Sequence, residues 1–203
     1  MAKIVATKRQ TTGTALPDPS EWEKASPICF CGDWRGRNED PQRETQARIL
    51  WSFDSLFIQF QCRYRDILVY EGQNNRKDQL WLRDVAEVFL QTGIDERSHY
   101  REFEISPNGN WLDLDIAPGR KTHLFWGLEN RVIVNPNTKM WTGELAIPML
   151  KIAPTFHPNE IWRINLFRIE GPEPNRFYSA WQPTYTEKAN FHVPECFGEL
   201  HFE

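Results

Sequence analysis

The amino-acid sequence predicts an all-β protein, an antiparallel β-sandwich of the jelly-roll type with a few short helical turns. Three observations predict it: many short apolar segments separated by turn residues, polar and apolar side chains that alternate within several segments, and an Asn-Gly pair between two of them. The 203 residues suit one domain with a well-filled core. We expect residues 1–14 to form an arm and residues 15–203 to form the domain.

The clearest single strand lies in the segment LFIQFQCRYR, which begins at Leu56. Every second residue from Leu56 to Tyr64 is apolar, and this period of two is typical of a half-buried strand. Other strand candidates have similar lengths and bounding turn residues; they span residues 130–135, 141–148, 161–169, 177–181 and 197–202. Residues 19–26 and 148–154 favour brief helical turns.

The segment QLWLRDVAEVFL, residues 79–90, fits either a helical stripe or a strand. The apolar run after Arg83 is only about seven residues long, which suits a strand better than a helix. We therefore expect a strand from Val85 to Gln91, entered from a loop that carries Trp81.

The segment REFEISPNGNWLDLDIA predicts a β-hairpin, because Asn and Gly both tolerate positive φ. With a tight turn at residues 108–109, Ile105 would lie opposite Leu112, and Phe103 opposite Leu114. One face would then be apolar. The other would gather four acidic side chains: Glu102, Glu104, Asp113 and Asp115.

Four carboxylates on one sheet face repel each other unless something compensates them. The negative charge could be compensated by arginines from neighbouring strands, by a hard cation such as Ca²⁺, or by the hydroxyl groups of a ligand. An ordinary solvated face with arginine partners and a binding site both remain open.

Aromatic residues make up 13% of the chain, with nine tryptophans. A sugar ring has an apolar face that stacks on indole and a rim of hydroxyls that bind carboxylates, amides and guanidinium groups. Trp81, Trp126 and Phe191 lie in polar or loop-like surroundings and are the candidate platforms. The remaining patterned tryptophans are assigned to packing: Trp22, Trp51, Trp141 and Trp162.

Composition excludes several classes of function. A formal net charge of −4 gives no basic surface for nucleic acid, and no apolar run approaches the length of a membrane span. The first residues lack the apolar core of a secretory signal, so we expect a cytoplasmic protein or one from which a leader was removed. The cysteines and histidines show no zinc-site spacing.

Catalytic motifs are absent: the sequence has no nucleophile elbow, phosphate loop or His-Glu-x-x-His pattern. A glycoside hydrolase needs two carboxylates across a cleft, and too many acidic residues compete for that role: Glu87, Glu102, Glu104, Asp113 and Asp115. Met140 and Met149 could serve as axial haem ligands but lack a convincing partner.

Seven segments, in order, resemble family 9 carbohydrate-binding modules, within the broader DOMON-like group of β-sandwiches. Among them WLRDVAEVFL is similar to Trp-x-x-Asp-x-x-Glu-x-Phe and WTGELAIPM to Trp-x-x-Glu-x-x-Ile-Pro. The others are DPSEWEKAS, ETQARILWSFDSLFIQFQCRYRD, YREFEISPNGNWLD, WRINLFRIE and FHVPECFGELHF. The resemblance covers roughly residues 15–203.

This resemblance implies non-catalytic glycan binding and structural calcium, with the terminal sugar of a β-glucan or xylan clamped between two aromatic side chains. Trp81 takes the place of the first aromatic and Phe191 that of the second. Glu87 falls on a family acid that hydrogen-bonds the sugar. Glu104 stands where the family has an arginine, and Lys188 roughly where it has an asparagine.

The leading hypothesis is therefore a domain that binds an oligo- or polysaccharide without cutting it. Its candidate ligand-binding residues are Trp81, Asp84, Glu87, Glu102, Glu104, Trp126, Arg168, Lys188, Asn190 and Phe191. Its alternatives are a glycoside hydrolase, a haem-binding DOMON-like domain, and a partner-binding domain that has lost the sugar site. The family function would place the chain outside the cytoplasm.

Overall fold

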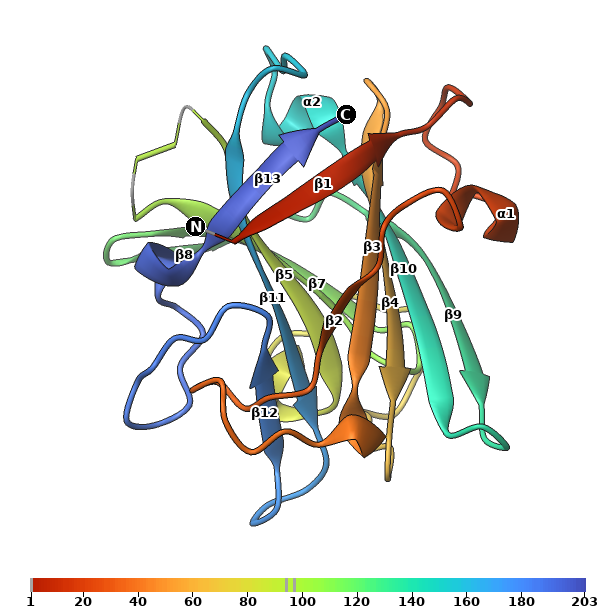
Figure 1. The fold of residues 1–203 in the computed structure, drawn as a ribbon, viewed down its shortest axis with the longest axis vertical. Helices are drawn as coiled ribbons and strands as arrows, with labels where there is room; N and C mark the ends of the chain where they lie inside the picture. Colours follow the sequence, from red (N-terminus) through yellow and green to blue (C-terminus); the bar gives the residue numbers. More distant parts are fainter. Residues whose placement is uncertain (1, 94, 97) are drawn as a thin grey trace.

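The computed structural model describes residues 2–93, 95–96 and 98–203, and this part of the chain forms a β-sandwich (Figure 1). The all-β prediction is confirmed. The strands are β1 (Lys3–Lys8), β2 (Ile28–Phe30), β3 (Thr45–Trp51), β4 (Ser55–Arg63), β5 (Val85–Gln91), β6 (Tyr100–Ile105), β7 (Trp111–Ala117), β8 (Arg120–His123), β9 (Glu129–Asn135), β10 (Met140–Pro148), β11 (Trp162–Glu170), β12 (Phe177–Ala180) and β13 (Gly198–Phe202).

Helical segments are short. They are α1 (Pro19–Trp22), α2 (Met149–Ile152) and the 3-10 turns η1 (Pro41–Arg43), η2 (Leu80–Leu82) and η3 (Pro194–Cys196). The two expected helical turns correspond to α1 and α2, and the strand expected from Val85 to Gln91 is β5. No helix among the described residues has the length and apolar character needed to cross a membrane.

Strand β1 joins two sheets. One has the order β8-β7-β6-β5-β11-β13-β1, with β12 beside β11, and the other the order β1-β3-β4-β10-β9, with β2 beside β3. Neighbouring strands are antiparallel except at β1, which runs parallel to β13 through residues 3–6 and parallel to β3 through residues 7–8. In Figure 1, β1 and β13 run side by side. Residues 3–8 are therefore a strand, where the sequence suggested an arm, and Ile4 and Ala6 are buried in the core.

The main core lies between the sheets, where Val88 and Leu90 of β5 join one cluster with Ile58 and Phe60 of β4. The expected inward face of β4, from Leu56 to Tyr64, belongs to this cluster. The assignment of four tryptophans to packing is confirmed, since each is at most 2% exposed: Trp22, Trp51, Trp141 and Trp162.

The register of the β6–β7 hairpin differs from the expected one by a single residue. Phe103 lies opposite Asp113, and Glu104 lies opposite Leu112. The connection is a three-residue loop in which Gly109 alone has positive φ, at 79°, where a two-residue turn was expected. A shift of one residue exchanges the faces of a strand. Asp113 therefore lies on the inner face, apart from Glu102 and Glu104.

A second apolar cluster lies on the outer face of the first sheet, the face of β5, β6, β7 and β11 that points away from the other sheet. It includes Phe89, Leu114 and Phe167 from the strands, with Leu80 of η2 and Phe191 packed over them. The η2 loop and the segment after β12 thus cover part of the sheet. Between them remains the pocket described next.

Candidate ligand-binding site

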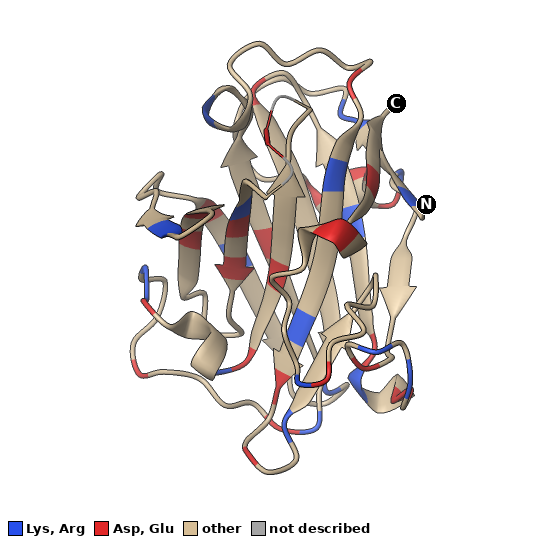
Figure 2. Ribbon diagram, turned by 90° about the vertical axis from the view of Figure 1, so that its left-hand side faces the viewer, with Lys and Arg blue, Asp and Glu red and all other residues tan. Residues whose placement is uncertain are grey.

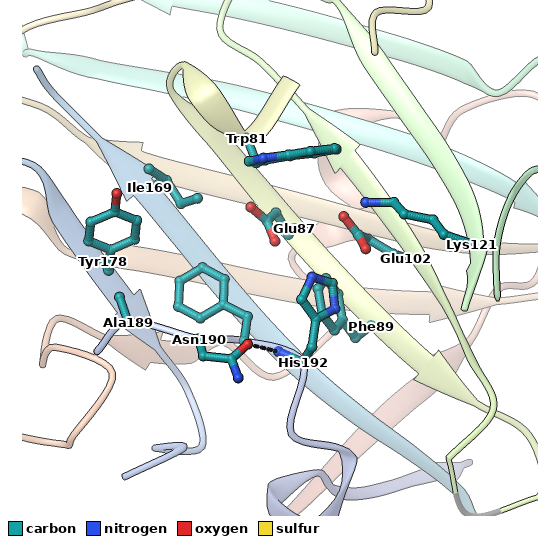
Figure 3. Close-up of a pocket in the computed structure, with 11 residues that line it drawn as sticks. Trp81, Glu87, Phe89, Glu102, Lys121, Ile169, Tyr178, Ala189, Asn190 and His192 are labelled. Carbon is teal, nitrogen blue, oxygen red and sulfur yellow. Dashed lines mark hydrogen bonds between the residues drawn. The ribbon is translucent and has the colours of Figure 1, made fainter. Parts of the chain in front are cut away.

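A cavity of about 240 Å³ opens on the outer face over β5, β6 and β11. Figure 3 shows the Trp81 indole edge-on along one side, with the carboxyl groups of Glu87 and Glu102 below it and Asn190 and His192 across the space. The lining residues are Trp81, Glu87, Phe89, Glu102, Lys121, Ile169, Tyr178, Ala189, Asn190, Phe191 and His192. The volume lies below the roughly 300 Å³ at the lower end for drug-sized ligands, so it suits one small ring.

Trp81 is presented by the η2 turn. Its neighbour Leu80 is fully buried in the outer cluster and anchors the turn, while the indole is half-buried. The Arg176 guanidinium donates hydrogen bonds to the carbonyl oxygens of Trp81, Leu82 and Arg83, at 2.6, 3.0 and 2.9 Å. A single side chain from the β11–β12 connection thus fixes the backbone that carries the ring.

The segment from Ala189 to His192 forms the opposite wall. Phe191 stacks on Phe167, with ring centroids 4.2 Å apart and planes 12° apart, and only 7% of it is exposed. The His192 ring is held by a 2.8 Å hydrogen bond between its Nδ1 and the Tyr100 hydroxyl. Burial lowers the pKa of His192, so its imidazole is neutral at neutral pH.

Three glutamates lie on one face of β5 and β6. Glu87 lies directly opposite Glu104 in the register, and Glu102 shares their face. All three residues are at most 2% exposed. Glu87 Oε1, Glu102 Oε2 and both carboxyl oxygens of Glu104 have no hydrogen-bond partner among the described residues. Figure 2 shows acidic positions side by side on neighbouring strands of this sheet.

Burial raises the pKa of Glu87 well above its usual value, and the neighbouring Glu102 carboxylate raises it further. Burial likewise raises the pKa of Glu104, with the carboxylates of Glu87 and Glu102 adding to the effect. These carboxyl groups therefore keep their protons to a higher pH than an exposed glutamate does. In the protonated form they can donate as well as accept hydrogen bonds.

Lys121 supplies the positive charge. Its Nζ atom lies 3.9 Å from the centroid of the Trp81 ring, a cation–π contact. In Figure 3 the side chain reaches from β8 into the space between Trp81 and Glu102. All four residues of β8 are exposed, so this lysine enters the site from a solvated edge strand.

The structure brings together five of the ten candidate residues chosen from the sequence: Trp81, Glu87, Glu102, Asn190 and Phe191. Glu104 lies beside Glu87 but is fully buried beneath the cavity lining. Phe191 differs from the expectation of a free-standing platform, because Phe167 covers one of its faces.

Four candidates lie elsewhere, and their assignment as ligand contacts is corrected. Arg168 is fully buried, pairs with Ala86 in the register and lies over the Trp141 ring at 5.2 Å, on the inner face. Asp84 is also fully buried, and its carboxylate accepts hydrogen bonds from the backbone of Gly171 and Leu68, at 2.8 and 3.2 Å. Both side chains stabilise the fold through these contacts.

The remaining two are Trp126 and Lys188. Trp126 packs against the inner cluster, 5.9 Å from the Phe103 ring, and its backbone N–H donates to Asp113. Lys188 is exposed and does not line the cavity. Sequence reasoning missed Lys121, Tyr178 and His192. The position of His192 next to Phe191 in the sequence could have indicated it as a site residue. The polar β8 segment carries no pattern that would have indicated Lys121.

The calcium that the resemblance implies finds no matching donor set. Asp33 is surrounded by N–H donors, the backbone of Arg35 and Arg37 and the side chain of Asn38, at 2.8, 3.0 and 2.8 Å. Asp113 is likewise occupied by donors. Within residues 2–93, 95–96 and 98–203, no three His, Cys, Asp or Glu side chains converge as metal ligands.

Comparison with known proteins gives distant relatives. No protein-family model matches the chain. An "Extracellular protein" of Arthroderma benhamiae is 24% identical over 182 residues, covering 81% of each chain. The human "UPF0462 protein C4orf33" is 27% identical over 131 residues, covering 62% of each chain, so the match spans less than two thirds of that relative.

Solved structures share the fold. A Bacteroides uniformis protein to which carbohydrate binding has been ascribed superposes with a TM-score of 0.80 at 16% identity, covering 99% of each chain. A family 9 carbohydrate-binding module from Caldicellulosiruptor kristjanssonii, in complex with cellotriose or with glucose, gives a TM-score of 0.67 at 14% identity; it covers 100% of this chain and 94% or 96% of the module. At these identities the likeness establishes a β-sandwich fold shared with carbohydrate-binding proteins.

Proposed function

We propose that the outer-face pocket binds carbohydrate, without cleaving it, by stacking one sugar ring on Trp81. The observation that carries this proposal is the placement of a partly exposed indole and two glutamates, Glu87 and Glu102, around one ring-sized cavity. An indole supplies the flat apolar surface that a pyranose face requires. Glu87, Glu102 and Asn190 supply hydrogen-bonding groups for its hydroxyls.

The solved relatives support the same proposal. The Caldicellulosiruptor modules are described in complex with cellotriose and with glucose. A cavity of about 240 Å³ is consistent with the terminal ring of a β-glucan or xylan-type chain, the rest of which would lie outside. We propose Trp81 as the stacking platform and Phe191 as an apolar wall facing it, since Phe191 retains only a small exposed area.

A catalytic alternative would use Glu87 and Glu102, the two carboxyl groups that line the cavity. A glycosidase of the usual type needs one of its two carboxylates ionised, as nucleophile or as base. Burial and its carboxylate neighbour favour the protonated form of Glu87. The haem alternative relied on Met140 and Met149 as axial ligands. Met149 is fully buried in the inner core, and Met140 does not line the cavity.

Calorimetry with glucose, cellotriose and xylotriose tests the proposal. We expect the unaltered protein to bind at least one of them, and Trp81→Ala to weaken that binding at least tenfold. Phe125→Ala is the matched control, because Phe125 is 69% exposed and lies away from the cavity lining. Absence of binding to every saccharide, or equal binding by Trp81→Ala, would refute the proposal. Turnover of a chromogenic glycoside lost in Glu87→Gln would favour the hydrolase.

A further inference from the structure

The pocket is lined by more acidic than basic side chains. Two carboxyl-bearing residues line it, Glu87 and Glu102, and a third, Glu104, lies beside Glu87 in the register. Among the described lining residues, Lys121 is the single lysine or arginine. Acidic groups at this density require compensating positive charge or bound protons.

The nearby arginines do not meet this requirement. Arg176 is engaged by three backbone carbonyl oxygens of the η2 loop. Arg168 lies on the inner face, where its guanidinium contacts the carbonyl of Val85 at 3.2 Å and the Trp141 ring. Both act on Glu87 only through space. The cavity itself therefore retains an excess of acid.

Lys121 marks where a cation is held. Its ammonium lies over the Trp81 ring at 3.9 Å, on the edge of the cavity that Glu87 and Glu102 line. An aromatic face next to carboxyl oxygens is the arrangement that binds organic ammonium groups. Among residues 2–93, 95–96 and 98–203, the Lys121 ammonium is held by its contact with the Trp81 ring and its attraction through space to Glu87, without a side-chain hydrogen bond or ion pair.

Building on the proposed function, we propose that this pocket selects an amino sugar, such as glucosamine, whose ammonium group takes the place that Lys121 now occupies. The sugar ring would stack on Trp81, as a neutral sugar would. Its protonated amine would approach Glu87 and Glu102, while Lys121 swings out from the exposed β8 strand.

The choice between an amino sugar and its neutral analogue follows from charge. A neutral ring that displaces Lys121 removes positive charge from buried carboxyl groups and returns none. An ammonium restores that charge and adds a charge-assisted hydrogen bond. An ammonium also favours ionised Glu87, whose pKa burial raises, so binding should release a proton from that carboxyl group.

A metal ion is a poor alternative occupant, since no three ligating side chains converge here or elsewhere in the described residues. The aromatic walls, Trp81, Tyr178 and Phe191, also favour a ligand with an apolar body. An ammonium attached to a sugar ring combines both properties.

The test compares three probes at pH 6 by calorimetry: glucosamine, glucose, and N-acetylglucosamine, in which the amine is capped and neutral. We expect glucosamine to bind at least tenfold more tightly than either neutral sugar. Glu87→Gln should bring the ratio of glucosamine affinity to glucose affinity close to one, whatever its effect on glucose binding itself; an unchanged ratio contradicts the inference. Lys121→Ala should strengthen glucosamine binding, because it removes the internal competitor. Lys151→Ala is the matched control, a lysine that lies over Trp126 on another part of the surface.

The outcomes separate the two proposals. Glucose binding equal to or tighter than glucosamine binding overturns the amino-sugar inference and leaves carbohydrate binding intact. Absence of binding to all three probes and to cellotriose and xylotriose overturns both. As a second readout, the heat of glucosamine binding should vary with the ionisation enthalpy of the buffer, as proton release requires; a heat that is independent of the buffer contradicts the ion pairing.

Discussion

Glu87 on β5 lies directly opposite Glu104 on β6, and both carboxyl groups are almost completely excluded from water. Two acids in this position destabilise the fold when both are ionised. The pair is tolerable in the folded protein because burial raises the pKa of each group, so that protons are retained. Selection for stability alone would favour a neutral pair.

Glu104→Gln should therefore stabilise the protein in a pH-dependent way. Above pH 4.5 an unfolded glutamate loses its proton while folded Glu104 keeps it, so the folded state binds more protons and stability falls as pH rises. Each such group costs about 1.4 kcal/mol per pH unit over that window. We expect the variant to match the parent near pH 4.5 and to become progressively more stable than the parent as the pH rises to 8. Urea denaturation at both values measures this, with exposed Glu23→Gln as control; equal gains at both values would contradict it.

Mutation of Phe191 tests whether its ring is a buried part of the wall that faces Trp81. Because the ring is 7% exposed and stacks on Phe167, we expect Phe191→Ala to lower the free energy of unfolding by about 3 kcal/mol. Trp81→Ala should cost much less stability, since its indole is half-buried. Denaturant titration distinguishes the two residues. A Phe191→Ala protein as stable as the parent would mean that the ring is a free platform after all.

Arg176 should affect ligand affinity without touching the ligand. Its guanidinium holds three consecutive carbonyl oxygens of the loop that carries Trp81, so Arg176→Ala should loosen the stacking platform. We expect roughly tenfold weaker saccharide binding, the equivalent of about 1.4 kcal/mol, with the fold retained by circular dichroism. Arg120→Ala, an exposed change on β8, is the control. Unchanged affinity in Arg176→Ala would show that the loop is held by its other contacts.

Asp113 tests the assignment of faces. Its carboxylate accepts hydrogen bonds from the backbone of Phe125 and Trp126 and from Arg76, on the inner face. Asp113→Asn should reduce stability by about 2 kcal/mol through unpaired donors. Saccharide affinity should stay within twofold at a temperature where the variant is folded. A folded variant that has lost binding would place Asp113 at the site.

The sequence predicted the strands correctly where one face of a strand is buried and the other is exposed to solvent. Residues 56–64 show this alternation and form β4 as expected. Where both faces are covered, the pattern disappears. In β11 almost every residue is buried, so the polar character of Arg168 did not reveal that it points inward against Trp141.

The predicted register of the β6–β7 hairpin was wrong for a local reason. The Asn-Gly pair favours a two-residue turn, but the connection uses three residues, and this one-residue difference moved Asp113 to the other face. Lys121 was missed because β8, Arg-Lys-Thr-His, is an edge strand without an apolar residue and has no periodicity to detect. Five of the eleven lining residues were among the candidates, which came from residue type together with the family resemblance. The other site residues depend on the register of the strands and on β8, which is recognised as a strand only by its pairing with β7.

The double pairing of β1 has a consequence for biosynthesis. Its first half aligns with residues 199–202 of β13 and its second half with residues 50–51 of β3, so one end of this strand can dock early whereas the other must wait for β13. A nascent chain that has not yet released β13 from the ribosome exposes an unpaired strand edge, which is where chains associate wrongly. This sandwich can therefore complete its first sheet only after β13 has been synthesised.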